Sequence, residues 1–248
     1  MVLPVIDQLL SERKRLVFVF LLTDERMTFM QTFKKFFEPS EYINSLDARI
    51  AEKAKMLAKT ETDLPGTVRR FFYFVRDQIF YDPTEEQRLL SASAVLVFGR
   101  GNALGKACLF AALCRAKGVP AGIAFQLIKD HKVLTNSKQA TEKWHAITRV
   151  LMTDKWLTLD PSLDRHFALG RKFFAPSFDG TNDAILPAKD WQGAKNYEIG
   201  ETSPAFSDVP YCFISHNHKT EFEKGVIACV CDHCRLRCSW VTTGQYSG

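Results

Sequence analysis

Residues 101–121, GNALGKACLFAALCRAKGVPA, and residues 144–161, WHAITRVLMTDKWLTLDP, decide the fold that we expect for this chain. In the first stretch a glycine-containing turn precedes Asn102, a residue type that caps helix N-termini. The residues after it, 103–117, are apolar on nearly every side, which is typical of a buried helix. Gly118 stands where a helix-terminating glycine belongs, and a proline follows two residues later. The first stretch therefore predicts a buried helix over residues 103–117.

The second stretch predicts a β-hairpin. Residues 144–151 and 156–160 have the composition of strands, and the polar segment between them turns near residue 153. Side chains alternate between the faces of a sheet, so this hairpin places His145 and Asp160 on the same face of adjacent strands. They would lie opposite or diagonal to each other. The sequence thus predicts that a carboxylate meets an imidazole.

A buried helix whose N-terminus follows a turn, together with a His and an Asp on neighbouring strands, is the arrangement of a cysteine-nucleophile enzyme. The helix N-terminus lowers the pKa of the thiol and offers backbone N–H groups to an oxyanion, the His takes the proton, and the Asp orients the His. The first helical position, however, is Ala103, which has no nucleophilic atom. Cys108 lies five residues further on, about 140° around the helix, and Cys114 lies further still. We therefore interpret both cysteines as core residues.

Four motifs of the chain resemble the core of the transglutaminase-like superfamily. In that family a Gly-x-Cys opens a helix that ends in Arg-Ala-x-Gly-Ile-Pro-Ala, a His-Ala follows on a strand, and a Trp-x-x-x-Asp-Pro completes the triad. The segment from residue 76 to residue 82 also resembles the helix that commonly precedes this core. The matching motifs are residues 101–107, 113–121, 144–146 and 156–161. The resemblance is specific because the motifs occur together, in the same order and at the right spacing.

The resemblance implies an α+β, papain-like fold in which a helix packs on a small antiparallel sheet after a helical N-terminal segment. The sheet is expected to include a strand over residues 121–128, directly after the buried helix. We expect three parts: an N-terminal helical segment over residues 1–62, a transglutaminase-like core over residues 63–200, and a loop-rich tail with a cysteine cluster over residues 201–248. Glycine and proline recur at short intervals after Arg165, which predicts loops there.

The resemblance also implies roles for individual residues. His145 matches the general base of the family, Asp160 its orienting carboxylate, and Ala103 the position of its nucleophile. Asn102 and Trp144, next to these positions, are the expected substrate-binding residues. The implied function is that of a cysteine acyltransferase or amide hydrolase. Such an enzyme acts through a thioester on a peptide, protein or small-molecule amide or ester, and needs no cofactor for catalysis.

Ala103 leaves two explanations open. In the first, the chain is an engineered Cys→Ala variant of an active enzyme and is itself inactive. In the second, it is a natural pseudoenzyme that serves as a protein-binding or nucleic-acid-binding scaffold. The first explanation is favoured because a fold without catalysis has no need of a buried His and Asp pair. The chain retains His145, Asp160, Trp144 and Trp156.

The C-terminal segment contains a cluster of cysteines, in which four thiols and an imidazole lie within ten residues. The expected metal ligands are Cys229, Cys231, Cys234 and Cys238. Thiolates so close together suit a structural zinc ion. Their spacing nevertheless differs from the two C-x2-C pairs of a zinc ribbon. A zinc site and an unliganded tail therefore both stay open.

Composition limits the partners of the chain. Its 248 residues include 33 Lys or Arg and 28 Asp or Glu, a net charge of +5 that is too small to indicate nucleic-acid binding. The longest apolar run, residues 16–22, is far shorter than the roughly 20 residues of a membrane-spanning helix, so we expect no membrane partner. Seven cysteines, an odd number with two in the predicted buried helix, favour reduced thiols and a cytoplasmic location.

Overall fold

The computed structural model describes residues 33–83, 91–134, 140–153 and 155–210. The chain divides into two compact units, residues 1–35 and residues 36–248. Most of the predicted N-terminal segment and the whole cysteine cluster lie outside the described residues. The divisions that we expect after residues 62 and 200 remain predictions.

Each helix of the second unit begins at a residue whose side chain accepts a backbone N–H from the first turn, which satisfies one of the free donors of a helix N-terminus. The helices are α2 (Ala48–Leu57), α3 (Leu64–Gln78), α4 (Ala92–Phe98), α5 (Ala103–Ala116) and α6 (Arg165–Gly170), and a short 3-10 turn η1 (Lys34–Phe36) precedes them. The capping residues are Asp47, Asp63, Ser91, Asn102 and Asp164. The predicted start of the buried helix at Asn102 is therefore confirmed.

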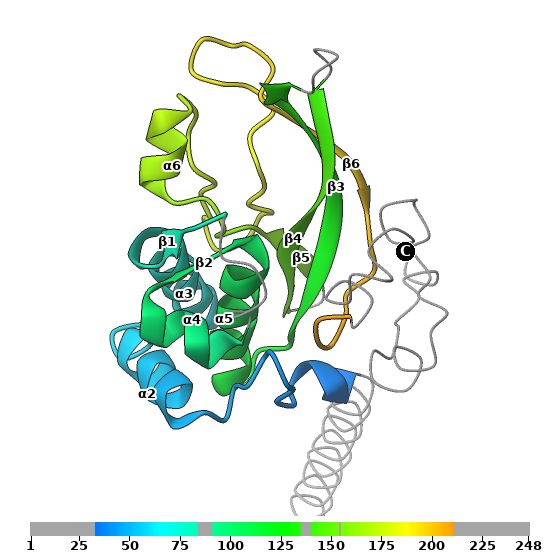
Figure 1. The fold of residues 1–248 in the computed structure, drawn as a ribbon. Coiled ribbons are helices and arrows are strands. Elements are labelled where there is room, and N and C mark those ends of the chain that lie inside the picture. Colours follow the sequence, from blue (N-terminus) through cyan, green and yellow to red (C-terminus); the bar gives the residue numbers. More distant parts are fainter. Residues whose placement is uncertain (1–32, 84–90, 135–139, 154, 211–248) are drawn as a thin grey trace, which may run out of the picture. The chain divides into compact units, whose positions relative to one another are not determined.

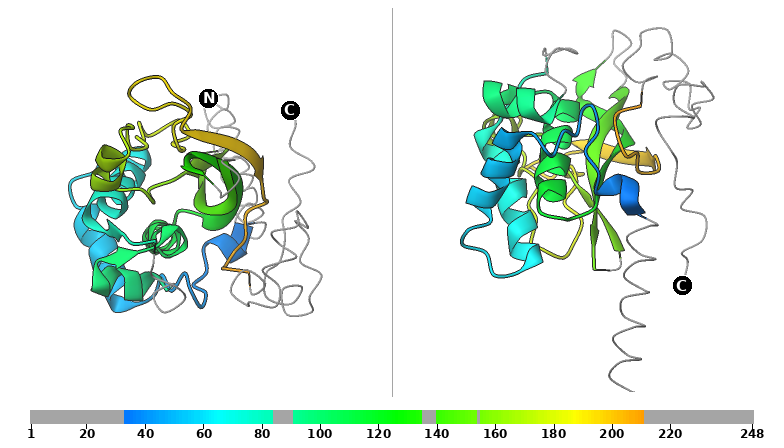
Figure 2. Two further views of the ribbon diagram at one scale, coloured as in Figure 1. Left: turned by 45° about the horizontal axis from the view of Figure 1, so that its top comes forward. Right: turned by 90° about the horizontal axis from the view of Figure 1, so that it is seen from below.

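The strands form a curled antiparallel sheet and a separate parallel pair (Figure 1). The sheet has the order β5-β4-β3-β6, with β3 (Ala121–Leu134), β4 (Ala140–Met152), β5 (Lys155–Leu159) and β6 (Tyr197–Thr202). The parallel pair joins β1 (Phe80–Tyr81) to β2 (Arg100–Gly101). Helices α2 to α5 gather on one side of the sheet, as Figure 2 shows. The predicted α+β class is confirmed.

The hairpin of β4 and β5 turns where the sequence predicts. Met152 pairs with Lys155, and Thr153 adopts a positive φ of 57° in the turn. The strand β3 is longer than the predicted 121–128, because its second half pairs with both β4 and β6. The strand β6 and the helix α6 also lie where glycine and proline predicted loops. The sequence does not show the pairing of β3 with β6, since it joins residues about 70 positions apart.

The helix α5 is the centre of the core. All of its residues from 104 to 115 are buried, and it packs on α2, α3, α4, β3 and β4. The ring of Phe110 meets the ring of Phe72 from α3 edge to face, with centroids 6.0 Å apart. The predicted buried helix is confirmed.

Arg115, near the end of α5, joins three separate segments although it is almost fully buried. Its guanidinium donates to the carbonyl of Ala121 at 2.9 and 2.7 Å, to that of Glu38 at 2.6 Å and to that of Ser207 at 2.7 Å. Burial lowers the pKa of Arg115 to about 10, so the side chain remains charged at neutral pH. Four charge-assisted hydrogen bonds thus fix α5 to the start of β3 and to the segments that carry Glu38 and Ser207.

Candidate functional site

His145 and Asp160 lie in contact, as the predicted hairpin requires. Thr148 of β4 pairs with Leu159, the last residue of β5, so the next residue, Asp160, follows the strand directly and lies diagonal to His145 on the same face. His145 Nε2 is 2.8 Å from Asp160 Oδ2. The side chains are almost fully buried, with 5% of His145 and none of Asp160 exposed. The catalytic roles of the two residues remain predictions.

Asp160 is held as a carboxylate. Burial acts to raise its pKa, but the charge of His145 and hydrogen bonds from His145 and Ser162 outweigh this effect, so the pKa lies below its usual value. The backbone N–H of Ser162 donates to Asp160 Oδ1 at 3.0 Å, and Ser162 Oγ lies 3.2 Å from His145 Nε2. A buried carboxylate that bonds one ring nitrogen fixes the orientation of the imidazole.

Sequence reasoning missed Ser162, although the hairpin contains the signal for it. Continuing the pairing of Thr148 with Leu159 by three residues on each strand places Ser162 directly opposite His145. On the other side of β4, Gln126 of β3 pairs directly with His145. The Gln126 carboxamide donates to Thr202 Oγ1 at 3.2 Å, while its Oε1 is buried without a hydrogen-bond partner among the residues that the structure describes. His145 is therefore flanked by polar side chains on both sides, Gln126 from β3 and Ser162 from the segment after β5.

The first turn of α5 is tied to the segment that carries Asp160. Asp164 Oδ2 accepts the N–H of Tyr81 in β1 at 2.8 Å, and Tyr81 pairs with Gly101 in β2, two residues before Ala103. On the other side, Thr148 of β4 donates its hydroxyl to the carbonyl of Ala107, one turn after Ala103. Helix α5 thus lies against the strand that carries His145, with its N-terminus at the segment after Asp160.

The other three predicted site residues lie at the start of α5, in the case of Asn102 and Ala103, and on β4, in the case of Trp144. Ala103 is partly buried and packs against the main core. Asn102 Oδ1 accepts the N–H of Gly105 at 2.9 Å, so its side chain caps the helix. Trp144 is partly buried and packs against the same core. Substrate binding by Asn102 and Trp144 stays a prediction.

Lys106, one turn into α5, is a second buried ionisable group near the site. It is fully buried, and its Nζ donates to the carbonyls of Ile79 at 2.7 Å and Arg76 at 3.3 Å, at the end of α3. Burial lowers the pKa of Lys106 to about 7, although the carboxylates of Asp164 and Asp160 act to raise it. Sequence reasoning missed this group. The available signal was a single lysine in the first turns of an otherwise apolar helix.

Cys108 and Cys114 are core residues, as predicted. Both side chains are fully buried. Burial raises the pKa of both thiols far above the usual value, so neither supplies a thiolate near neutral pH. Neither cysteine therefore replaces the missing nucleophile.

Within the described ranges, no group of three or more His, Cys, Asp or Glu side chains could hold a metal ion. The predicted ligands Cys229, Cys231, Cys234 and Cys238 lie outside those ranges, so the zinc site stays a prediction. None of the helices in the same part of the chain is long and apolar enough to cross a membrane.

Comparison with known proteins gives one family match. The model of the transglutaminase-like superfamily matches residues 50–161, a range that includes Ala103, His145 and Asp160. No curated protein matches the chain.

The solved structures that match this chain have low sequence identity to it. One is a protein from Cytophaga hutchinsonii described as a candidate cysteine protease, with 21% identity over 68% of this chain and 51% of that one, and a TM-score of 0.43. Another is the periplasmic domain of TgpA from Pseudomonas aeruginosa, with 16% identity over 57% of this chain and 49% of that one, and a TM-score of 0.42. The chain spans about half the length of both proteins.

Proposed function

We propose that this chain, which belongs to the transglutaminase-like superfamily through its residues 50–161, has the function of an acyl-transfer enzyme when position 103 is a cysteine. Such an enzyme takes the acyl group from an amide or ester and carries it as a thioester. Members of this superfamily are typically cysteine proteases or acyltransferases. We propose that His145 is the general base, that Asp160 orients it, and that position 103 carries the nucleophile.

The observation that carries the proposal is the buried contact of 2.8 Å between His145 Nε2 and Asp160 Oδ2, on a strand that lies along α5. The stability of the fold does not explain a buried charged pair, because apolar residues of similar volume often stabilise a fold equally well. An imidazole that is oriented by a carboxylate beside a helix N-terminus is, by contrast, suited to activate a thiol.

The proposed reaction has two steps. In the first, His145 Nδ1 takes the thiol proton of the cysteine, the thiolate attacks the carbonyl carbon, and the C–N or C–O bond breaks as the imidazolium returns the proton to the leaving group. In the second, water or an amine loses a proton to the imidazole and attacks the thioester, and the thiol leaves with that proton. Asp160 stabilises the imidazolium, and the N–H groups at the start of α5 face the oxyanion.

Ala103 favours one alternative function, that of a scaffold that binds a partner and catalyses no reaction. The present chain has no sulfur at position 103, so it can bind a substrate but cannot form the thioester. Whether this alanine is an engineered change or the natural residue decides between an inactivated enzyme and a pseudoenzyme. The substrate that we propose for the enzyme is a peptide, a protein or a small-molecule amide or ester. The scaffold would instead bind a protein or a nucleic acid.

The experiment restores the thiol in the variant Ala103→Cys. A peptide p-nitroanilide and a p-nitrophenyl ester serve as acyl donors, the reaction is stopped with acid, and peptide mass spectrometry locates the acyl group. We expect acylation at position 103, and none at that position in the original chain. The double variant Ala103→Cys/His145→Ala should react at least about 100-fold more slowly, since general-base catalysis contributes that much or more.

Cys108 and Cys114 provide an internal control, because their buried thiols should stay unmodified while the chain is folded. Addition of methylamine shows whether the acceptor is an amine or water, since only aminolysis yields the methylamide. The proposal is wrong if Ala103→Cys keeps the circular dichroism spectrum of the original chain yet gains no acyl group from either donor.

A further inference from the structure

Three large apolar side chains lie exposed together beside α6. Phe174 is 76% exposed, Leu169 61% and Trp191 44%. All three line one groove, with a volume of about 520 Å³, that also contains Tyr73 and Arg165. The rings of Phe174 and Trp191 pack together with centroids 5.8 Å apart. Single exposed apolar residues are ordinary, whereas a contiguous patch of them indicates a binding surface.

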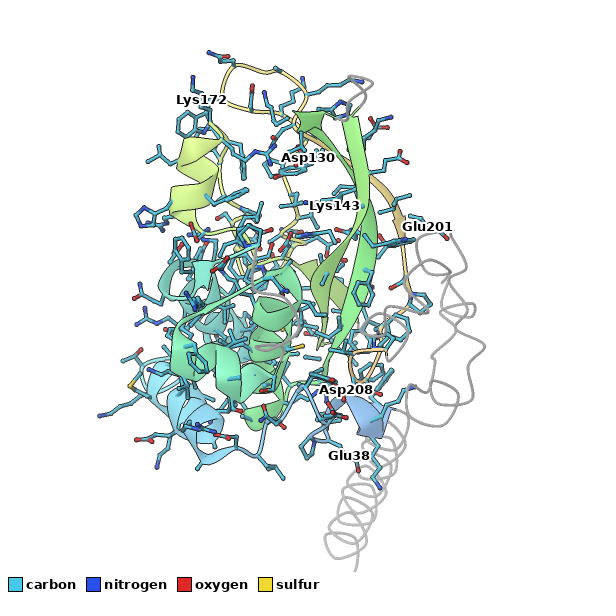
Figure 3. The ribbon with its side chains drawn as sticks, in the orientation of Figure 1. Glu38, Asp130, Lys143, Lys172, Glu201 and Asp208 are labelled. Atoms are coloured by element: carbon cyan, nitrogen blue, oxygen red, sulfur yellow. The ribbon has the colours of Figure 1, made fainter. Side chains whose placement is uncertain are left out.

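The walls of this groove are fixed by contacts to the rest of the fold. Lys172, which Figure 3 labels next to α6, accepts the backbone N–H of Trp191 at 2.8 Å through its own carbonyl. The preceding Arg171 forms two hydrogen bonds with Asp130 of β3, at 2.8 and 2.6 Å. These contacts fix the backbone at Trp191 and the segment just before Phe174, so less backbone entropy is lost when a ligand binds.

The groove has an excess of positive charge. Arg76 Nε lies 2.8 Å from Asp77 Oδ1, and Arg76 also donates to Asp77 Oδ2 at 2.9 Å. Arg165 Nε is 3.4 Å from the same Oδ1, and 71% of the Arg165 side chain is exposed. One carboxylate thus faces two guanidinium groups. A carboxylate from a partner would complete the charge balance at Arg165.

We propose that this groove binds a peptide segment in which an aromatic or large aliphatic side chain adjoins an acidic residue. The apolar side chain packs between Phe174, Trp191 and Leu169, and the carboxylate pairs with Arg165. The volume of the groove lies within the range of small-ligand pockets, which is enough for one or two side chains.

The groove borders the elements that hold the candidate site. Arg165 begins α6 five residues after Asp160. The backbone carbonyl of Arg76 accepts a hydrogen bond from the ammonium group of Lys106 in α5. A peptide in the groove would therefore lie beside the proposed reaction centre. The further assignment of this peptide as the acyl donor rests on the proposed function, whereas its binding does not.

The test uses the chain as it stands, with Ala103, so that no reaction takes place. The probe is the peptide acetyl-Glu-Phe-Leu-Glu-amide, and binding is followed through the indole N–H signal of Trp191 in ¹H–¹⁵N spectra, assigned with Trp191→Phe. We expect a Kd of about 1 mM or lower. The peptides acetyl-Lys-Phe-Leu-Lys-amide and acetyl-Glu-Ala-Ala-Glu-amide should bind at least about tenfold more weakly, because each lacks one of the two recognised features.

Matched variants locate the site of binding. Phe174→Ala should weaken binding of the acidic peptide about tenfold, and Arg165→Glu about threefold or more. Leu46→Ala and Lys55→Glu, which change exposed residues outside the groove, should leave the Kd unchanged.

Three results would overturn the inference: no binding of the acidic peptide, equal binding of the basic peptide, or a Kd that neither groove variant changes. Self-association that Phe174→Ala abolishes would also overturn it, because the groove would then bind a second copy. Failure of this test leaves the acylation experiment at position 103 unaffected, and failure of that experiment leaves peptide binding unaffected.

Discussion

Lys106 gives the stability of this chain an unusual pH dependence. Burial lowers the pKa of its amine from the ordinary 10.5 to about 7 in the folded chain. The unfolded chain therefore binds more protons than the folded chain between pH 7 and pH 10.5, and the free energy of unfolding rises with pH across this window. Below pH 7 the full cost of burying the ammonium is present. A pKa difference of about 3.5 at about 1.4 kcal/mol per unit makes this cost about 5 kcal/mol.

The variant Lys106→Met removes the titrating amine and keeps most of the side-chain volume. Urea unfolding at pH 7, 8 and 9 measures the free energy of unfolding of both proteins. Between pH 7 and pH 9 the original chain should gain about 2 kcal/mol relative to the variant, because half of the folded amines have already lost their proton at pH 7. The comparison cancels the contributions of other titrating groups, since both proteins share them. The exposed Lys117, changed to Met, is the control and should not alter the slope.

The absolute stability of Lys106→Met has no bearing on this test, because the variant also loses the hydrogen bonds to the carbonyls of Arg76 and Ile79. If the variant does not fold, a ¹³C titration of the lysine Cε resonances in the original chain measures the same quantity. One amine should titrate near pH 7. Parallel slopes in the two proteins, or no lysine titrating below pH 9, would refute the reasoning.

Other substitutions test the core directly. Arg115→Leu should lower the free energy of unfolding by about 3 kcal/mol in urea titrations, because the buried carbonyls that it binds lose their donors. Gly122→Ala should cost about 2 kcal/mol or more in the same assay, because its Cβ would lie 2.5 Å from the Phe206 carbonyl oxygen. Cys108 and Cys114 should resist a disulfide reagent such as DTNB in the native chain and react once urea unfolds it, and fast labelling of either in native buffer would contradict their assignment to the core.

The features that sequence predicts well are those with local signals. The helix over residues 103–116 is marked at its start by Asn102, at its end by Gly118, and along its length by apolar residues. The hairpin that brings His145 to Asp160 follows from two short strands and one turn. In both cases the deciding residues lie close together in the chain.

The features that sequence missed depend on distant contacts. The segment Tyr197–Thr202 contains a glycine and two glutamates, and it becomes a strand only because β3 offers an edge for pairing. Lys106 appears in sequence as one charge among apolar neighbours, and only the end of α3 shows why a buried ammonium is tolerated there. The exposed Phe174 and Trp191 are 17 positions apart, so their joint groove is not visible in the chain.

The central claim is that the His145 and Asp160 pair acts on a thiol at position 103. The most direct measurement is the pH dependence of iodoacetamide alkylation of Ala103→Cys, with and without His145→Ala. A thiolate beside an imidazole and a helix N-terminus should have an inflection at least about one pH unit below the ordinary 8.5, and His145→Ala should move it upward. An inflection at or above 8.5 that His145→Ala does not change would contradict the account.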